Sequence, residues 1–316
     1  MNPALSVLLL TTLIGAAQGL VLVLAGVELA ARAAGPGGAT LPSTFLLAGA
    51  AVALILSGAG LVASFFHLGH PERAWRAIAG WRSSWLSREV IVLPAFMGAT
   101  ALYGLARWAG HEAALALLLL GGLLALALFV CTGMIYAAVK AIREWASPYT
   151  VPNFLVMGLA SGLTLAAALA AFTAADWVGP VGRLALAATL LATGLRLAAQ
   201  RRNQRLVPKS TLQTAIGVRH PRIVQKAQGA MGGSFQTREF ASSQPTELLR
   251  RQAIRSVVGG WLAPTLLLLP VALGAPGLAW VLVAAVLAQL WGLVSERWLF
   301  FAQARHPQSL YHPTPT

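Results

Sequence analysis

The chain has 316 residues, of which 57% are hydrophobic and only 10% are charged, and its mean hydropathy is +0.71. A water-soluble domain of this length needs far more charged side chains to cover its surface. The apolar residues also occur in blocks of about 20, the length that spans a bilayer as a helix. Because lipid offers the backbone no hydrogen-bond partners, such blocks must be helical. The composition therefore excludes a soluble globular domain and predicts an all-α polytopic membrane protein.

Eight apolar segments follow one another and predict a bundle of eight transmembrane helices. The first is longer than the apolar core of a signal peptide, roughly 7–15 residues, and no Lys or Arg precedes it, so we interpret it as a retained span. The eight segments cover approximately residues 4–31, 43–66, 89–108, 113–138, 152–175, 178–199, 255–274 and 277–301. No internal repeat is visible, which disfavours a transporter built from inverted halves. Residues 1–316 are thus expected to form a single membrane domain.

The distribution of Lys and Arg predicts how the bundle is oriented. With eight spans, both termini share one face with the connectors after spans two, four and six. That face carries 20 of the 23 Lys and Arg residues, and the opposite face keeps Arg32, Arg107 and Arg183. The positive-inside rule therefore places the basic face, with both termini, in the cytoplasm. Topology and anionic lipid headgroups explain the net charge of +14, so we expect no nucleic-acid partner.

Residues 200–254 form the long polar connector of the chain. The segment is rich in Gln, Ser, Arg and Gly and lacks the apolar periodicity of an independent core. Loops of this length are usually functional or disordered. Between these alternatives we prefer a basic cytoplasmic loop that folds against a soluble partner.

The connector from residue 67 to residue 89 is the densest polar cluster: HLGHPERAWRAIAGWRSSWLSRE. Its three tryptophans are typical of a segment at the level of the lipid headgroups. Most of the connector is therefore interpreted as an interfacial amphipathic segment with snorkelling arginines. Candidate residues for docking a soluble partner are the arginines of this connector and of the long loop: Arg76, Arg82, Arg88, Arg219 and Arg222.

His67 and Glu89 stand out within this connector. His67 ends the second span and Glu89 opens the third, so each side chain can point back into the apolar layer. An ionisable group at such a depth is costly and is a functional candidate. An imidazole can donate to a carbonyl oxygen, and a carboxylate can relay a proton. The spacing leaves two interpretations open: a redox-ligand site, or a His–Glu or Glu–Arg packing pair.

A few other polar residues lie within or near the spans. Gln18 is in the middle of span one, where an amide usually bonds a neighbouring helix at roughly 1 kcal/mol. Glu28 and Asp176 lie near the less basic face, which is consistent with contact to headgroups. Glu296 and Arg297 are adjacent in span eight and are expected to pair with the basic connectors.

The sequence predicts no haem, iron–sulfur cluster or metal in this chain. Six-coordinate haem needs two axial ligands, and His67 is the only histidine at the end of a span. Cys131 is the only cysteine, whereas an iron–sulfur cluster takes about four. We interpret Cys131 as a buried structural thiol.

Residues 63–71 (ASFFHLGHP), Arg73-Ala74-Trp75 and residues 84–89 (SWLSRE) resemble the anchor subunit of dimethyl sulfoxide reductase-type enzymes. Residues 15–24 and 295–301 are similar too, and the eight-span plan matches along the whole chain. The resemblance implies a haem-free, quinone-reactive anchor in a bacterial plasma membrane, which holds an iron–sulfur subunit and a molybdopterin catalytic subunit. It assigns the binding of ubiquinone or menaquinone to His67 and Glu89, with Glu89 as proton relay, and less directly to Arg73 and Gln18.

The long basic loop is similar to that of anchors from cytoplasm-facing, sulfite-oxidising relatives. Partners docked on the basic face would be cytoplasmic, which favours oxidation of a cytoplasmic donor such as sulfite with electrons passed to quinone. The alternative within the family is the anchor of a dimethyl sulfoxide or related reductase that oxidises menaquinol. Alternatives of other classes are a passive scaffold and a transporter. The scarcity of polar residues deep in the spans disfavours a transporter.

The topology is tested by cysteine labelling of intact cells with a membrane-impermeant maleimide. Ser210→Cys, in the long loop, should remain unlabelled until the membrane is opened. Glu112→Cys, in the connector between spans three and four, should be labelled from outside. Labelling of Ser210→Cys in intact cells would contradict the assigned orientation.

The cofactor expectation is tested on the purified subunit. Optical and electron paramagnetic resonance spectra should show neither a b-type haem nor an iron–sulfur signal. A haem Soret band that remains stoichiometric with the chain after purification would show that the expectation is wrong.

Overall fold

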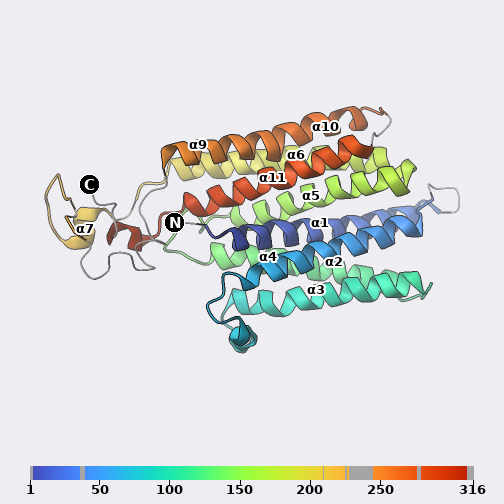
Figure 1. The fold of residues 1–316 in the computed structure, drawn as a ribbon, viewed down its shortest axis with the longest axis horizontal. Coiled ribbons are helices and arrows are strands. Elements are labelled where there is room, and N and C mark those ends of the chain that lie inside the picture. Colours follow the sequence, from blue (N-terminus) through green and yellow to red (C-terminus); the bar gives the residue numbers. More distant parts are fainter. Residues whose placement is uncertain are drawn as a thin grey trace.

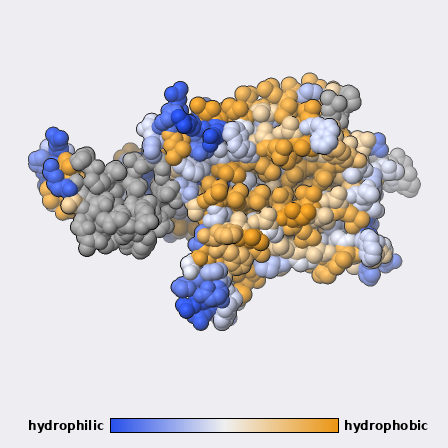
Figure 2. Space-filling model, in the orientation of Figure 1, coloured by the Kyte–Doolittle hydropathy of each residue, from blue (hydrophilic) through white to orange (hydrophobic). Residues whose placement is uncertain are grey.

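A computed structural model describes residues 3–35, 40–208, 210–224, 226–227, 245–275 and 279–311. The described residues form helices and connectors without a strand, and eight helices are long and apolar enough to cross a membrane. They run side by side in one bundle (Figure 1). Figure 2 shows a broad apolar belt over the helices, with hydrophilic residues gathered at the two ends. The predicted all-α, eight-span class is confirmed.

Seven of the spans are single α-helices, and the seventh span in chain order is composite. The single helices are α1 (Leu5–Ala33), α2 (Ser43–Phe65), α3 (Trp85–Trp108), α4 (Ala114–Ala137), α5 (Thr150–Thr173), α6 (Ala175–Gln204) and α11 (Ala279–Ala302). The seventh span, Thr246–Ala272, joins α9 (Thr246–Arg255), the π-helix η4 (Ser256–Leu262) and α10 (Ala263–Ala272). Among the described residues, three short helices lie outside the spans: η2 (Pro71–Gly80), α7 (Leu212–Ile216) and η5 (Pro307–Tyr311).

Helical structure reaches further into the predicted 200–254 loop than the apolar pattern indicates. At one end α6 continues to Gln204, with Arg201 and Arg202 in its last turn, where cations interact favourably with the helix dipole. At the other end α9 begins at Thr246. Residues 228–244 lie outside the described residues, so the central part of the expected partner-binding loop remains a prediction.

Helices α1 and α5 form the centre of the bundle and cross at close range. Each carries two glycines four residues apart, Gly15 and Gly19 in α1 and Gly158 and Gly162 in α5. A Cβ atom on Gly19 would meet the backbone of Gly158, and one on Gly162 would meet the backbone of Gly19. Small residues at this spacing let membrane helices approach until their backbones touch. The position of α1 against α5 is therefore set by these glycines.

The start of α1, the end of α11 and the short helix α7 lie at the same end of the bundle (Figure 1). We call this the basic end, because most of the Lys and Arg residues lie in its connectors. The 3-10 helix η2 also lies there, and Trp75 in its middle and Trp81 directly after it are exposed. Exposed tryptophans in a short helix outside the spans agree with the expected interfacial segment.

Polar contacts fasten the described part of the long connector to the bundle. The Arg143 guanidinium donates to the Val207 carbonyl at 2.6 Å, and Arg202 donates to the Arg143 carbonyl at 3.0 Å. The Tyr311 hydroxyl donates to the Ala215 carbonyl at 3.3 Å, which joins η5 to α7. The connector between α4 and α5, the long connector and the C-terminal segment thus meet at the basic end.

The α1–α5 crossing predicts that alanine substitution of two glycines in α1 has very different effects on the stability of the subunit. Gly19→Ala places a methyl group against the Gly158 backbone and should destabilise the subunit by about 1–3 kcal/mol. Gly26→Ala is the matched control, because nothing lies within 4 Å of its added Cβ. Thermal unfolding in detergent should show a lower midpoint for Gly19→Ala alone. Equal midpoints for the two variants would contradict the close crossing.

Candidate functional site

Glu89 is positioned by the start of α3. Ser84 is the N-cap residue, and its hydroxyl accepts a hydrogen bond from the Ser87 backbone N–H at 3.3 Å, which fixes where the helix begins. Arg88, which directly precedes Glu89, turns back to the connector, where its Nε donates to the Trp81 carbonyl at 3.0 Å. Successive helical side chains are rotated by about 100°. Glu89 therefore faces the neighbouring helices instead of the connector.

A small cavity of about 10 Å³ lies beside Glu89 between α1, α3, α4 and α5, and we call it the Glu89 cavity. The hydroxyl of Thr132, from α4, donates a hydrogen bond to the Oε1 atom of Glu89. Gln18 projects into the same cavity from α1. The other lining residues are Leu10, Thr11, Ile14, Gly15, Phe129 and Phe154. The fold thus brings together two of the residues predicted from sequence, Gln18 and Glu89.

The polar groups of this cavity are incompletely paired. Gln18 is only 2% exposed, and in the described part of the chain its amide has no hydrogen-bond partner, so it does not bond a neighbouring helix as its mid-span position suggested. Glu89 likewise has no cation at ion-pair distance among the described residues. Leaving a buried polar group unpaired costs about 1–3 kcal/mol. The cavity therefore offers an amide and a carboxylate oxygen to a further polar molecule.

The size of the Glu89 cavity limits what it can enclose. A cavity of 10–15 Å³ has room for about one water molecule. The Gln18 amide, and the carboxyl group of Glu89 when it is protonated, can donate to the carbonyl oxygen of a quinone, but about 10 Å³ does not hold the ring. The residues fit a proton-donating contact at the edge of such a ligand.

His67 lies two residues beyond the end of α2, is exposed and does not line the Glu89 cavity. Partial desolvation lowers the pKa of its imidazole, which favours the neutral ring with one donor and one acceptor nitrogen. The neighbouring residue Phe66 is also exposed. The structure therefore places His67 at the outer surface and Glu89 inside, on adjacent helices at the basic end.

The predicted arginines all lie outside the Glu89 cavity. Arg73 is exposed and interacts with Glu72 of the same short helix, with 3.6 Å between Nε and Oε1. Arg76 and Arg82 stack over the tryptophans that precede them, Trp75 and Trp81. Arg219 and Arg222 are exposed in the long connector. These positions are accessible to a docking partner, and Arg73 does not reach the cavity.

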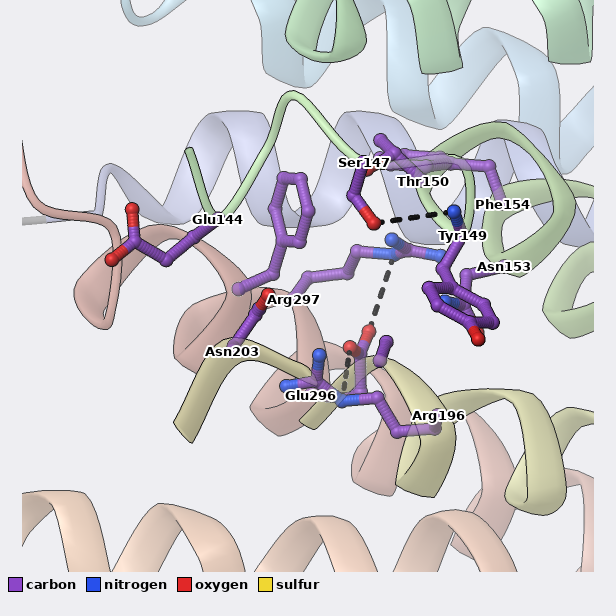
Figure 3. A pocket seen from close by; sticks show the side chains of 12 residues that line it. Glu144, Ser147, Tyr149, Thr150, Asn153, Phe154, Arg196, Asn203, Glu296 and Arg297 are labelled. Atoms are coloured by element: carbon purple, nitrogen blue, oxygen red, sulfur yellow. Dashed lines mark hydrogen bonds and ion pairs between the residues drawn. The ribbon is translucent and has the colours of Figure 1, made fainter. Parts of the chain in front are cut away.

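A second cavity of about 20 Å³ lies between α5, α6, α11 and residues 144–149 (Figure 3). Glu296 is buried here between two arginines, with Arg196 Nε at 3.0 Å and Arg297 Nε at 3.5 Å. The Arg297 guanidinium lies over the ring of Phe154, 3.8 Å from its centroid. Glu296 was expected to pair with a basic connector. Its partner Arg196 belongs to α6 instead and lies within the apolar segment predicted over residues 178–199.

Glu28 at the opposite end of the bundle does not face headgroups as expected. It is 2% exposed and pairs with Arg32 at 2.9 Å and Arg107 at 3.2 Å. The hydroxyl of Tyr103 also donates to it at 3.4 Å. This carboxylate links α1 to α3, and sequence position alone did not show that an arginine from α3 would reach it.

Sequence reasoning missed Thr132, Phe154 and Arg196. Thr and Phe are ordinary residues of apolar spans, so neither carried a signal of function. Arg196 lies near the end of the apolar segment predicted over residues 178–199 and was counted only among the charges of the basic face. An arginine within the last turns of a span usually pairs with a buried acid, so the position of Arg196 could have predicted a buried partner.

The family is decided by comparison with known proteins. Residues 1–302 match the family described as DMSO reductase anchor subunit (DmsC). This chain belongs to that family. The anchor is also 50% identical, over 329 aligned positions covering 99% of each chain, to a subunit of sulfite dehydrogenase from Allochromatium vinosum. The expected family is confirmed, and the anchor is a membrane subunit of an oxidoreductase complex.

Proposed function

We propose that this anchor passes electrons between an iron–sulfur partner subunit and membrane quinone, and that Glu89 is the proton relay of the quinone site. The observation that carries the proposal is the Glu89 cavity, where a carboxylate held by Thr132 faces the unpaired amide of Gln18. When bound, quinone supplies the capacity to accept two electrons and two protons. Membership of the DMSO reductase anchor family supports this function.

Thr132 and Gln18 prepare Glu89 for proton transfer. The hydrogen bond from Thr132 to Oε1 orients the carboxyl group and leaves Oε2 for other contacts. The cavity has room for a single water, which the Gln18 amide and Glu89 can bind together. Once Glu89 has taken up a proton from the aqueous side, it hands that proton over directly or through this water and returns to the carboxylate form.

His67 completes the site from the lipid-accessible side. Its neutral imidazole can donate a hydrogen bond to a carbonyl oxygen, and it lies beside exposed aromatic surface at Phe66. Because the Glu89 cavity is too small for a ring, we propose that His67 binds the quinone outside it while Glu89 supplies the proton from within.

The basic end provides the docking face for the soluble partners. The orientation rule places this end in the cytoplasm, where an iron–sulfur subunit and a molybdopterin subunit would meet Arg76, Arg82, Arg88, Arg219 and Arg222. The likeness to a sulfite dehydrogenase subunit supports sulfite as the electron donor and quinone as the acceptor. The second candidate, oxidation of menaquinol for a reductase, uses the same site in reverse and is supported by the family description.

The test uses the assembled complex with two variants and two assays. Glu89→Gln keeps the side-chain shape but removes the proton carrier, so turnover with quinone should fall more than binding weakens. His67→Ala removes a hydrogen bond to the ligand, at about 1.5–3 kcal/mol, and should raise the KM for quinone. Donor oxidation with an artificial acceptor should stay unchanged in both variants, because it bypasses the anchor.

Glu28→Gln is the matched control for Glu89→Gln. It makes the same chemical change in another buried carboxylate, at the opposite end of the bundle, and should leave quinone reduction unchanged per assembled complex. Equal loss of both activities in Glu89→Gln, or release of the partner subunits, would show that Glu89 is structural and that quinone binds elsewhere.

A further inference from the structure

The charges around the second cavity do not balance locally. Arg196, Glu296 and Arg297, which we call the arginine cluster, join two guanidinium groups to one carboxylate and so leave one excess positive charge. Their side chains are only 12%, 1% and 5% exposed, respectively. Glu144 also lines the cavity, but it is paired with Arg305 at 3.2 Å and cancels none of this excess.

The Glu89 cavity has the opposite imbalance. The carboxylate faces neutral groups on every helix packed against it: Thr132, Cys131 and Tyr136 from α4, Gln18 and Thr11 from α1, and Phe154 from α5. The cation closest in sequence, Arg88, is held by the connector carbonyls and stacks over Trp85. Within the described residues, no cation lines the cavity to balance Glu89.

Phe154 is the wall between these two unbalanced sites. It lines both cavities, and the guanidinium of Arg297 lies 3.8 Å from its ring centroid. The Nε atom of the same guanidinium lies 3.5 Å from Glu296, and its Nη2 atom donates to the Sδ atom of Met157 at 3.3 Å, a weak acceptor. The excess charge is therefore poorly screened on the side that faces Glu89. In a membrane interior, such a charge acts over a longer distance than it does in water.

We propose that Arg297 is a positioning residue of the redox site: the excess positive charge of the arginine cluster acts across Phe154 to stabilise negative charge on Glu89 and on the ligand oxygen beside it. The inference rests on the proposed function of Glu89. The proposed interaction gives a reason for burying the Arg297 cation over the neutral ring of Phe154. The excess positive charge of the arginine cluster and the negative charge of Glu89 then balance each other across the two cavities. Arg297 touches neither reactant and acts through Glu89.

A merely structural role makes a different prediction. The cluster also joins α6 to α11 through Arg196 and Glu296, so removal of Arg297 would then impair the subunit whatever residue stood at position 89. An electrostatic role requires the charge of Glu89. The two roles are separated by a double-mutant cycle.

The cycle compares Arg297→Gln, Glu89→Gln and the double variant in the assembled complex. Arg297→Gln should lower the kcat of quinone reduction about tenfold, because the charge that stabilises Glu89 is lost. The KM for quinone should change less, and donor oxidation with an artificial acceptor should not change. In the Glu89→Gln background the further loss should shrink to less than about twofold. Arg297→Lys keeps the charge and should retain most of the rate.

Arg107→Gln is the matched control, because it removes a partly buried cation from an ion pair with Glu28 at the opposite end of the bundle. Its quinone reduction per assembled complex should equal that of the parent protein. Arg196→Gln removes one charge from the same cluster and should reproduce the loss, which keeps the test available if Arg297→Gln does not assemble.

Three results would overturn the inference while leaving the proposed function intact. These are equal losses from Arg297→Gln in both backgrounds, no loss from Arg297→Gln, or assembly failure of both cluster variants while Arg107→Gln assembles. If Glu89→Gln alone left quinone reduction unchanged, the proposed function would fail, and the inference that rests on it would fail too.

Discussion

The glycine crossing of α1 and α5 is the contact on which the whole site depends. Gln18 lies next to Gly19 in α1, and Phe154 lies one turn before Gly158 in α5, so the same backbone contact that joins the helices sets both side chains against Glu89. A bulkier residue at the crossing would separate them. The contact also fixes the face of α5 on which Arg297 stacks. Packing by small residues thus determines where polar groups meet inside an apolar bundle.

In the part of the chain that the structure describes, buried charged side chains lie only toward the two ends of the bundle. Near the less basic end, Glu28 is enclosed by Arg32 and Arg107 and forms a compact ion-pair network. Near the basic end, Glu296 is enclosed by arginines, while Glu89 is left with a single hydroxyl donor. A carboxylate that is not fully paired at this depth is costly, which is a reason to associate it with function. The partly paired carboxylate lies at the basic end, where the proposed docking face is.

The number of spans was predictable from the long apolar blocks, and Glu89 and Gln18 were predictable as candidates because they are polar residues within those blocks. Long apolar blocks predict transmembrane helices, and an acid or amide within such a block is costly and therefore indicates a functional role. Thr132 and Phe154 were not predictable, since their roles arise only when α4 and α5 pack beside α1 and α3. The partner of Glu296 was not predictable either, because the contact between Arg196 of α6 and Glu296 of α11 arises only in the folded bundle. His67 was grouped with Glu89 from spacing, whereas the structure places it outside the cavity, so their cooperation remains a proposal.

The central claim is that quinone is bound at the basic end, between His67 and the Glu89 cavity. The most direct measurement is cross-linking of the assembled complex with a photoreactive quinone analogue, followed by mapping of the labelled residues by mass spectrometry. The account predicts labelling in the segment that joins α2 to α3 and in the first turns of α3, and this labelling should be competed away by unmodified quinone. Competable labelling confined to the opposite end, near Glu28 and Arg107, would contradict it.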